Sequence, residues 1–338
     1  MKSPLAIMTA AFLLLPILTL TAQPRVVNAF RAELPVKDIV FRNSMEGYMM
    51  GEQYVWKTTD GGASWTQDFP LPFHPPKTAI AVLGETGLMI GTQDGGIHFT
   101  RHPDSLWTYS QPIQGQTIRD IEVISENHWV AVTDSTILST IDGGKTYRTF
   151  IPDNNSTVIT ALDVTDASLM HVIERFRNIW RSTDGGETWH LLDNTDAVFG
   201  TLYDLRFTSP DTGFVASWYP WNLFTTTDGG QTWSAGPYEY PTSIAIAQGG
   251  TGAYATSELV KLSNDGGMTW SDSLKFGETF PGFEYREQKV LVAGESSVFV
   301  LLTNFNEIGQ GQSIIARIDR ASGVKSEGRK YNVQLDLR

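Results

Sequence analysis

One eight-residue pattern occurs five times in the sequence, and it restricts the possible folds more than any other feature. Each copy begins with Ser or Thr, has Asp two positions later, continues with Gly-Gly, and ends in an aromatic residue preceded by Ser or Thr. The five copies, here called boxes, are residues 58–65, 140–147, 182–189, 226–233 and 263–270. A motif that returns about every 40 residues indicates one structural unit repeated along the chain.

A sixth match, residues 92–99, is predicted to be a turn between two strands rather than a box. When residues 47–65 and 87–107 are aligned from their Gly-X-Met-X-Gly starts, Asp94 falls before the third strand and a degraded box falls at 100–107. The aromatic residues that end the boxes are then Trp65, Trp107, Tyr147, Trp189, Trp233 and Trp270. Their separations are 42, 40, 42, 44 and 37 residues, whereas a second box ending at Phe99 gives 34 and 48 for the first two.

Three short runs rich in β-branched and aromatic residues precede each box. In the first unit these runs are DIVF, GYMMG and YVWKTT. Such runs, separated by turn residues, are typical of β-strands, and the box turns the chain into a fourth run. Four antiparallel strands in about 40–45 residues are typical of one β-propeller blade. We therefore predict an all-β chain with seven four-stranded blades, six blades being the alternative.

The seventh unit has no box, and the prediction for it depends on strand-like runs alone. Its three runs are residues 283–286, 290–293 and 298–303. Three further runs lie near the chain ends, at residues 26–31, 313–319 and 331–337. We expect one of these three to complete a blade, because a closed ring leaves no open sheet edge.

The boxes are predicted to be structural. A turn Asp accepts hydrogen bonds from nearby backbone N–H groups, the glycines permit positive φ, and the final aromatic residue buries a large surface. The box carboxylates are Asp60, Asp142, Asp184, Asp228 and Asp265. Each belongs to its own blade, so they cannot converge on one substrate. The six His have no ligand spacing such as H-E-x-x-H, so no metal and no cofactor are predicted.

The N-terminus has the features of a signal peptide. Lys2 is followed by an almost wholly apolar stretch over residues 6–20, and small residues precede a predicted cleavage after Ala22. Residues 1–22 are therefore predicted to be the signal and residues 23–338 a single propeller domain, with an uncleaved anchor as the alternative. We expect an exported protein, periplasmic or secreted, that is a monomer and does not insert into the membrane after cleavage.

The charge and the cysteine content exclude several kinds of protein. Losing residues 1–22 removes one Lys and leaves a formal charge of −13. This opposes non-specific binding to nucleic acid or to anionic membranes. The chain has no Cys, which excludes disulfides, thiolate metal sites and cysteine nucleophiles.

The segments DIVF…GYMMG…VWKTTDGGASW and LRFTSPDTGFVAS…LFTTTDGGQTW resemble the photosystem II assembly/stability factor family, within the wider Asp-box (BNR) repeat group. The resemblance covers about residues 36–303. It implies a seven-bladed propeller that binds a client protein during the assembly of a membrane complex. We therefore predict a non-catalytic scaffold whose partner is a protein, with a membrane-complex subunit or an acidic segment as candidates.

The same boxes also occur in sialidases, so a sialidase-like glycoside hydrolase is the alternative function. That resemblance implies three arginines that grip a carboxylate, a Tyr/Glu nucleophile pair, an acid Asp and a Phe/Tyr-Arg-Ile-Pro motif. Residues 30–35 read FRAELP, so Ala and Glu replace Ile-Pro. Arg206 and Arg286 fall in or near predicted first strands, where a central site could use them. No Tyr/Glu pair can be assigned.

Two long loops after the second strands of units 4 and 5 form the predicted partner site. The first contains Arg175 and Arg177, and the second contains Trp218, Tyr219 and Trp221. Adjacent blades place equivalent loops side by side, and Arg and aromatic residues are frequent interface anchors. The alternatives are that the aromatic residues fold back onto their own blade or that the arginines pair with nearby acids.

In six units, the loop after the second strand has a carboxylate at or near its start. The residues are Glu52, Asp94, Asp134, Glu174, Glu258 and Glu295. They could form an acidic ring for a cation or a basic peptide, but ordinary turn chemistry is the favoured interpretation because acids are common in turns.

Overall fold

The computed structural model describes residues 24–320 except 33–34, 53, 71–74, 103–105, 153–157, 177, 193–199, 248, 285–286, 295–296 and 306–310. The predicted signal peptide, residues 1–22, lies outside this part of the chain. Within the described residues, no helix is long and apolar enough to cross a membrane.

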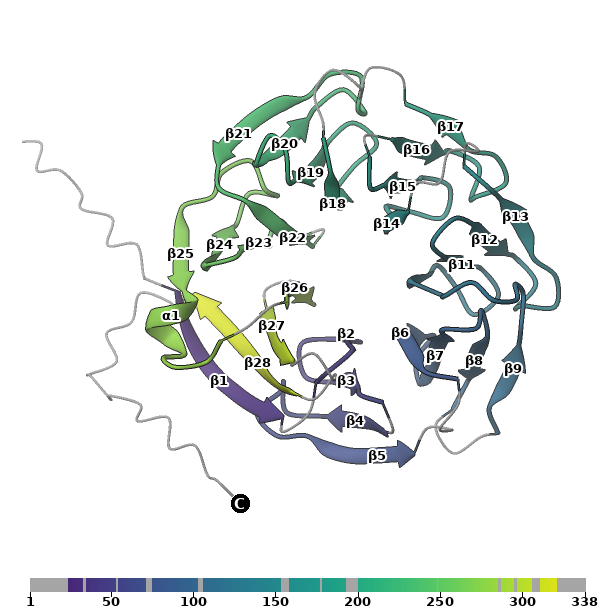
Figure 1. Cartoon of the computed structure of the whole chain (residues 1–338), viewed down its shortest axis with the longest axis horizontal. Helices are drawn as coiled ribbons and strands as arrows, with labels where there is room; N and C mark the ends of the chain where they lie inside the picture. The colour runs from purple at the N-terminus through teal and green to yellow at the C-terminus, as the bar shows by residue number, and fades with distance from the viewer. Residues whose placement is uncertain are drawn as a thin grey trace, which may run out of the picture.

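Seven four-stranded antiparallel sheets are arranged as blades around a central axis (Figure 1), which confirms the predicted seven-bladed propeller. Blades 1 to 3 consist of β2 (Asp38–Phe41), β3 (Gly47–Met50), β4 (Tyr54–Thr58) and β5 (Thr66–Pro70); β6 (Lys77–Leu83), β7 (Gly87–Thr92), β8 (Ile97–Thr100) and β9 (Thr108–Ser110); and β10 (Asp120–Val123), β11 (Trp129–Val132), β12 (Ile137–Thr140) and β13 (Arg148–Phe150).

Blades 4 to 6 follow in the same way along the chain. They consist of β14 (Ile159–Val164), β15 (Met170–Glu174), β16 (Ile179–Ser182) and β17 (His190–Leu191); β18 (Leu202–Phe207), β19 (Gly213–Ser217), β20 (Asn222–Thr226) and β21 (Ser234–Tyr238); and β22 (Pro241–Ile246), β23 (Gly252–Thr256), β24 (Leu259–Ser263) and β25 (Asp272–Lys275). A single turn of helix, α1 (Phe276–Thr279), leads into blade 7.

Blade 7 joins the two ends of the propeller. Its strand order is β1 (Pro24–Ala32), β28 (Gly311–Arg320), β27 (Ser297–Phe305) and β26 (Glu287–Ala293). β1 runs antiparallel to β28, with Phe30 opposite Ile315, and the two strands lie side by side in Figure 1. The ring is therefore closed by strands from both ends of the chain.

Two expectations for blade 7 were wrong. We expected one terminal run to complete a blade, but two do. Residues 313–319 lie in the third strand of this sheet and residues 26–31 lie in the fourth. Residues 331–337 lie outside the described residues. The run 283–286 is not the first strand. Phe283 and Glu284 follow a turn at Pro281-Gly282, where Gly282 has a φ of 78°, and the first strand is β26 instead.

The hydrophobic core is divided into clusters between neighbouring blades. Trp189 shows this arrangement: it is 5% exposed and packs with Trp180 of its own blade and with Val130 and Ile137 of blade 3. Each of the other box-ending aromatic residues lies in the same way between its own blade and the blade before it: Trp65, Trp107, Tyr147, Trp233 and Trp270.

Each box is a turn between the third and fourth strands of its blade, held by its own side chains. Asp184 accepts hydrogen bonds from the backbone N–H groups of Glu187 and Thr188 at 3.1 and 2.9 Å, and from the Thr188 hydroxyl at 2.5 Å. Hydrogen bonding to Thr188 is the main reason that the pKa of Asp184 falls to about 2. The other four box aspartates accept the backbone N–H and the hydroxyl of the Ser or Thr four residues later: Asp60, Asp142, Asp228 and Asp265.

The two glycines of the box allow the chain to reverse. Gly185 and Gly186 have φ angles of 76° and 84°, a region that side chains disfavour. The N–H of Gly186 donates to the Ser182 hydroxyl at 2.9 Å, which connects the start of the box to its centre. The side-chain hydrogen bonds of the box therefore join residues that are close in sequence.

Asp94 lies where the alignment places it, in the turn between β7 and β8 rather than between a third and a fourth strand. It accepts from the Thr92 hydroxyl at 2.6 Å and the Gly96 N–H at 3.3 Å. No hydrogen bond reaches it from the residue four positions on, and Trp107 rather than Phe99 precedes the fourth strand of this blade.

Candidate functional site

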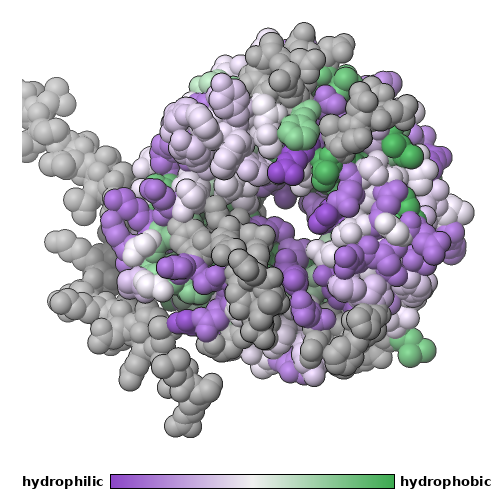
Figure 2. Space-filling model, viewed as in Figure 1, coloured by the Kyte–Doolittle hydropathy of each residue, from purple (hydrophilic) through white to green (hydrophobic). Residues whose placement is uncertain are grey.

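The first strands of the seven blades surround a central cavity of about 1110 Å³. Its opening is visible in the space-filling view, where hydrophilic residues border much of it (Figure 2). One position near the start of each first strand recurs around the wall: Asp38, Ala79, Asp120, Ala161, Asp204, Ser243 and Lys289. Two residues further along, the equivalent positions are Val40, Ala81, Glu122, Asp163, Arg206, Ala245 and Leu291.

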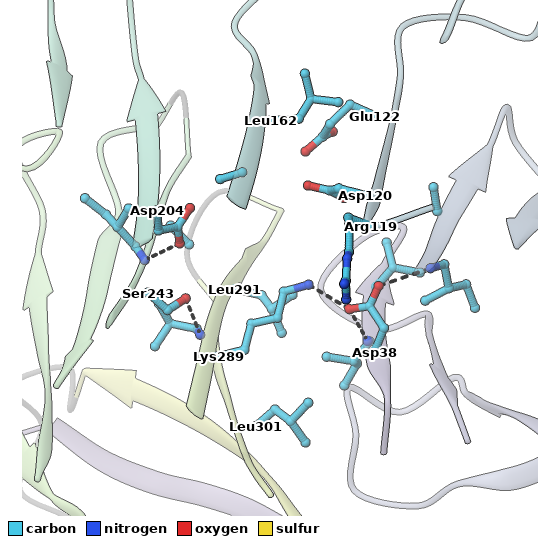
Figure 3. Close-up of a pocket in the computed structure, with 18 of the residues that line it drawn as sticks. Asp38, Arg119, Asp120, Glu122, Leu162, Asp204, Ser243, Lys289, Leu291 and Leu301 are labelled. Carbon is cyan, nitrogen blue, oxygen red and sulfur yellow. Dashed lines mark hydrogen bonds and ion pairs between the residues drawn. The ribbon is translucent and has the colours of Figure 1, made fainter. Parts of the chain in front are cut away.

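Carboxylates at the first of these positions connect neighbouring blades. Asp204 accepts the N–H of Leu205 in its own strand at 2.9 Å and the N–H of Ile244 in blade 6 at 2.8 Å (Figure 3). Asp38 makes the same pair of bonds, to its own strand at 2.8 Å and to Ile80 of blade 2 at 3.1 Å. These aspartates therefore have a structural role in holding the inner strands together.

Two cations face the carboxylates of the wall. The Lys289 ammonium lies 2.7 Å from Asp38. The Arg206 guanidinium lies 2.8 Å from Asp163, which is almost fully buried, and 3.6 Å from Glu122. Desolvation opposes the charge of both cations, but the surrounding carboxylates raise the pKa of Arg206 and of Lys289 above their usual values, so both remain charged.

The carboxyl groups of the wall are shifted in the opposite direction from those of the boxes. Desolvation raises the pKa of Glu122 to about 7 and that of Asp204 to about 6. It also raises the pKa of Asp120, and the neighbouring Asp38 adds to the effect. The first strands therefore contribute more carboxyl groups to the wall than Arg206 and Lys289 neutralise, and part of this excess is protonated near neutral pH.

The predicted partner loops lie at the end of the propeller where the first strands begin. Trp218 is 48% exposed and lines the cavity, with its ring edge-to-face against Tyr203 at 5.8 Å between centroids. Arg175 is exposed nearby: its carbonyl accepts the N–H of Leu202 at 2.9 Å, and its charge acts on the Tyr203 phenol. Arg175 and Trp218 therefore converge at the mouth of the cavity, while Arg177 lies outside the described residues.

Tyr219 and Trp221 belong to a separate group of aromatic side chains. Tyr219 is 61% exposed, and its ring centroid lies 5.4 Å from that of Trp221. Trp221 also contacts Tyr238 and Tyr240, at 5.0 and 5.2 Å between centroids. Sequence reasoning missed these two tyrosines. A signal for them is available in the run PYEYP, residues 237–241, where the fourth strand of blade 5 ends and the first strand of blade 6 begins. Of the five predicted residues, two thus lie at the cavity mouth, Arg175 and Trp218, and two lie in the aromatic group, Tyr219 and Trp221. Arg177 lies outside the described residues.

The carboxylates of the second-strand loops have ordinary local partners. Glu174 is buried and accepts from Asn178 at 2.6 Å and from the Trp180 indole at 3.1 Å. Asp134 pairs with Arg119 at 2.6 Å, and Glu52 with Lys37 at 3.5 Å. Glu295 lies outside the described residues. Turn and surface pairing therefore accounts for these acids, and the acidic wall of the cavity comes from the first strands instead.

Two segments of the chain, residues 180–191 and 224–235, match the BNR/Asp-box repeat. This is an Asp-box β-propeller. Its resemblance to the photosystem II assembly-factor type of propeller, predicted from the sequence, is confirmed in the fold. No curated protein sequence matches the chain.

Solved structures match this Asp-box propeller over nearly the whole fold. "YCF48 bound to D1 peptide" has a TM-score of 0.66 at 16% identity, covering 86% of this chain and 96% of its own. YCF48 from Cyanidioschyzon merolae has a TM-score of 0.62 at 16% identity, covering 87% and 98%. The WD40 propeller domain of Doa1 has a TM-score of 0.66 at 11% identity, covering 88% and 97%. At these identities the similarity establishes the fold alone.

Of the arginines of the Asp-box propeller considered for a sialidase-like site, Arg206 lines the cavity and Arg31 does not. Arg31 lies on β1, the outermost strand of blade 7, where it donates to Gln312 at 3.1 Å. Arg206 lines the cavity but is paired with Asp163, and Arg286 lies outside the described residues. Among the residues with a described position, no three His, Cys, Asp or Glu side chains could hold a metal ion together.

Proposed function

We propose that this chain is an exported, non-catalytic propeller that binds a polypeptide segment of a protein partner and serves as an assembly scaffold. The observation that carries the proposal is Trp218, a large aromatic side chain that is half exposed at the mouth of the central cavity, beside Arg175. Exposed aromatic residues next to Arg are typical anchors of protein interfaces.

A peptide partner is supported by the comparison of folds. The structure described as "YCF48 bound to D1 peptide" is a propeller that covers most of this chain and holds a peptide. On this chain, Arg175 provides a positive charge for an acidic residue of the partner. A subunit of a membrane complex is the partner that we propose, and the propeller acts as a monomer.

The pairing of the cavity arginines with acids of the chain also supports a binding role rather than a sialidase-like activity. A sialidase-like enzyme needs free guanidinium groups to grip the carboxylate of its substrate. Among the described residues, the two arginines that line the cavity are Arg119 and Arg206. Each faces a carboxylate of the chain itself, Asp134 and Asp163 respectively. Turnover of a sialoside by the purified protein would contradict the binding role and support the enzyme.

The proposed export depends on the N-terminal sequence. The closing strand β1 begins at Pro24, two residues after Ala22, so cleavage there leaves the strand whole. N-terminal sequencing of the protein from the exported fraction should begin at Gln23. A protein that retains its apolar N-terminus would instead indicate the anchored alternative.

Affinity capture from the exported fraction, followed by mass spectrometry, tests the proposed partner site. Trp218→Ala should weaken capture of the dominant partner about 30-fold, because a central interface anchor contributes about 2 kcal/mol or more. Met268→Ala is the matched control, since Met268 is 56% exposed in a box turn at the opposite end of its blade. Unchanged capture by Trp218→Ala would place the site elsewhere, and a large fall in its melting temperature would mean that Trp218 serves packing.

A further inference from the structure

The wall of the central cavity carries an excess of negative charge. Five carboxyl groups come from first strands: Asp38 on β2, Asp120 and Glu122 on β10, Asp163 on β14 and Asp204 on β18. Two cations of the first strands oppose them, Arg206 on β18 and Lys289 on β26. Lys37 and Arg119 also line the cavity, but they are paired with Glu52 and Asp134. β6 and β22 place Ala and Ser at the equivalent positions, so they contribute no charge there.

Most of these carboxyl groups already have strong partners. Asp38 holds Lys289, Asp163 holds Arg206, and Asp204 accepts two backbone N–H groups. The two acids of β10, Asp120 and Glu122, have fewer or longer contacts with donors and cations.

Asp120 and Glu122 lie on the same strand and project toward the cavity (Figure 3). Asp120 accepts the N–H of Ile121 at 2.8 Å but, within the described part of the chain, makes no bond to blade 4 like those that Asp38 and Asp204 make to their next blades. Glu122 lies 3.6 Å from Arg206, whereas the same guanidinium nitrogen lies 2.8 Å from Asp163. Both acids therefore have capacity for a further cation.

There is space beside these acids and an aromatic surface at the entrance. Ala81 and Ala161 line the neighbouring wall, where longer side chains would fill the cavity. Tyr203 and Trp218 line the same cavity at its mouth. A Lys or Arg side chain that enters past these rings can pack its apolar stem on them and bring its charge to the carboxylates.

We propose that the central cavity receives one cationic side chain, Lys or Arg, of the partner segment, and binds its charged end between Asp120 and Glu122. This inference rests on the proposed function and names the chemistry of the partner at that site. Charge complementarity supports it, because the first strands bring five carboxyl groups but two cations to the wall, and the other lining cations, Lys37 and Arg119, are paired with acids outside these five. An acidic residue of the same segment can face Arg175 at the mouth.

Binding of a cation is linked to proton release. The pKa of Glu122 is about 7 and that of Asp204 about 6 because burial disfavours their charged forms. A cation bound between Asp120 and Glu122 stabilises the Glu122 carboxylate and lowers its pKa. At about pH 6.5, where Glu122 is largely protonated, binding should release about 0.5–1 proton.

The test is calorimetric titration of the full-length mature protein with acetyl-Gly-Phe-Lys-Phe-Gly-amide and with the same peptide containing norleucine in place of Lys. The Lys peptide should bind at least about 10-fold more tightly, a difference of about 1.4 kcal/mol. Titrations in two buffers of different ionisation enthalpy should reveal the proton release. The preference for Lys should be smaller at about pH 5, where Glu122 is protonated.

The double variant Asp120→Asn with Glu122→Gln should lose both the preference for Lys and the proton release. The matched control is Glu126→Gln with Asp211→Asn, which removes the same charge from turns at the opposite end of blades 3 and 5 and should leave both intact. Equal binding of the two peptides by the wild type, no binding at millimolar peptide, or a preference that survives in the cavity variant would overturn the inference. If capture of the partner depends on Trp218 but the cavity variant captures it equally well, the proposed scaffold function is supported and the cation site is contradicted.

Discussion

The box turns and the cavity wall use the same chemical group in opposite ways. In the box, hydrogen bonds hold the pKa of Asp184 at about 2, whereas in the cavity desolvation raises the pKa of Glu122 to about 7. The box carboxylate is exposed but fully occupied by donors from its own turn. The cavity carboxyl group is surrounded by protein and by other acids. The comparison shows that the carboxylates of the boxes are structural, while the functional candidates lie among the desolvated acids of the first strands.

The two regions also differ in where their partners lie along the chain. The donors to Asp184 lie three and four residues away. The cation nearest to Asp38 lies 251 residues away, at Lys289. Box stability should therefore respond to local changes, and cavity charge to changes in other blades. The following predictions test this difference.

The largest effect is expected from Trp189→Ala at the rim. The Trp189 side chain is 5% exposed between blades 3 and 4, so its removal should lower the free energy of unfolding by about 3–5 kcal/mol. Trp218→Ala at the cavity mouth should change it by less than about 0.5 kcal/mol, because that ring is half exposed. Urea denaturation of both variants measures the difference, and equal losses would contradict the division between structural rim and binding mouth.

A smaller loss is expected from Asp184→Ala. The turn loses an acceptor for two N–H groups and two hydroxyl groups, which should cost about 1–2 kcal/mol of unfolding free energy. Asp94→Ala should cost less than about 0.5 kcal/mol, because Asp94 lacks the bonds to the residue four positions on. The reverse order in denaturation experiments would mean that residues 92–99 form the true box of blade 2.

The smallest and most pH-dependent effect is expected from Glu122→Gln. The pKa of Glu122 is about 7 in the folded chain, above its value in an unfolded chain. Ionisation therefore costs stability as the pH rises through about 7, and the variant should be more stable than the wild type by about 1 kcal/mol at about pH 8. At about pH 5 the two should melt alike.

Asp184→Asn is the matched control for that pH dependence. The pKa of Asp184 is about 2, below its unfolded value, so its carboxylate stabilises the fold above about pH 4 and this contribution is lost as the pH falls toward 2. The variant should be less stable than the wild type near neutral pH, and the gap should close in acid. Thermal melts across this range would contradict the comparison if both variants changed in the same direction with pH.

The sequence by itself determined the features that depend on neighbours along the chain. Each box is complete within eight residues, and each strand run shows its own pattern, so the seven blades and the displaced box of blade 2 could be predicted. Arg206 could be placed near a centre because it lies in a first strand. The ring of Asp120 and Asp204 could also have been found, by aligning the first strands DIVF, DIEV and DLRF.

The tertiary structure decided the features that depend on distant parts of the chain. Both terminal runs joined blade 7 because Phe30 and Ile315 meet only when the ring closes. Trp218 turned toward the cavity while Tyr219, the next residue, joined another aromatic group, because each contacts rings from different segments. The charge of the cavity arises in the same way, since β2, β10, β14 and β18 are far apart in sequence but bring their acids together, and partial desolvation there raises the pKa of Glu122 and of Asp204.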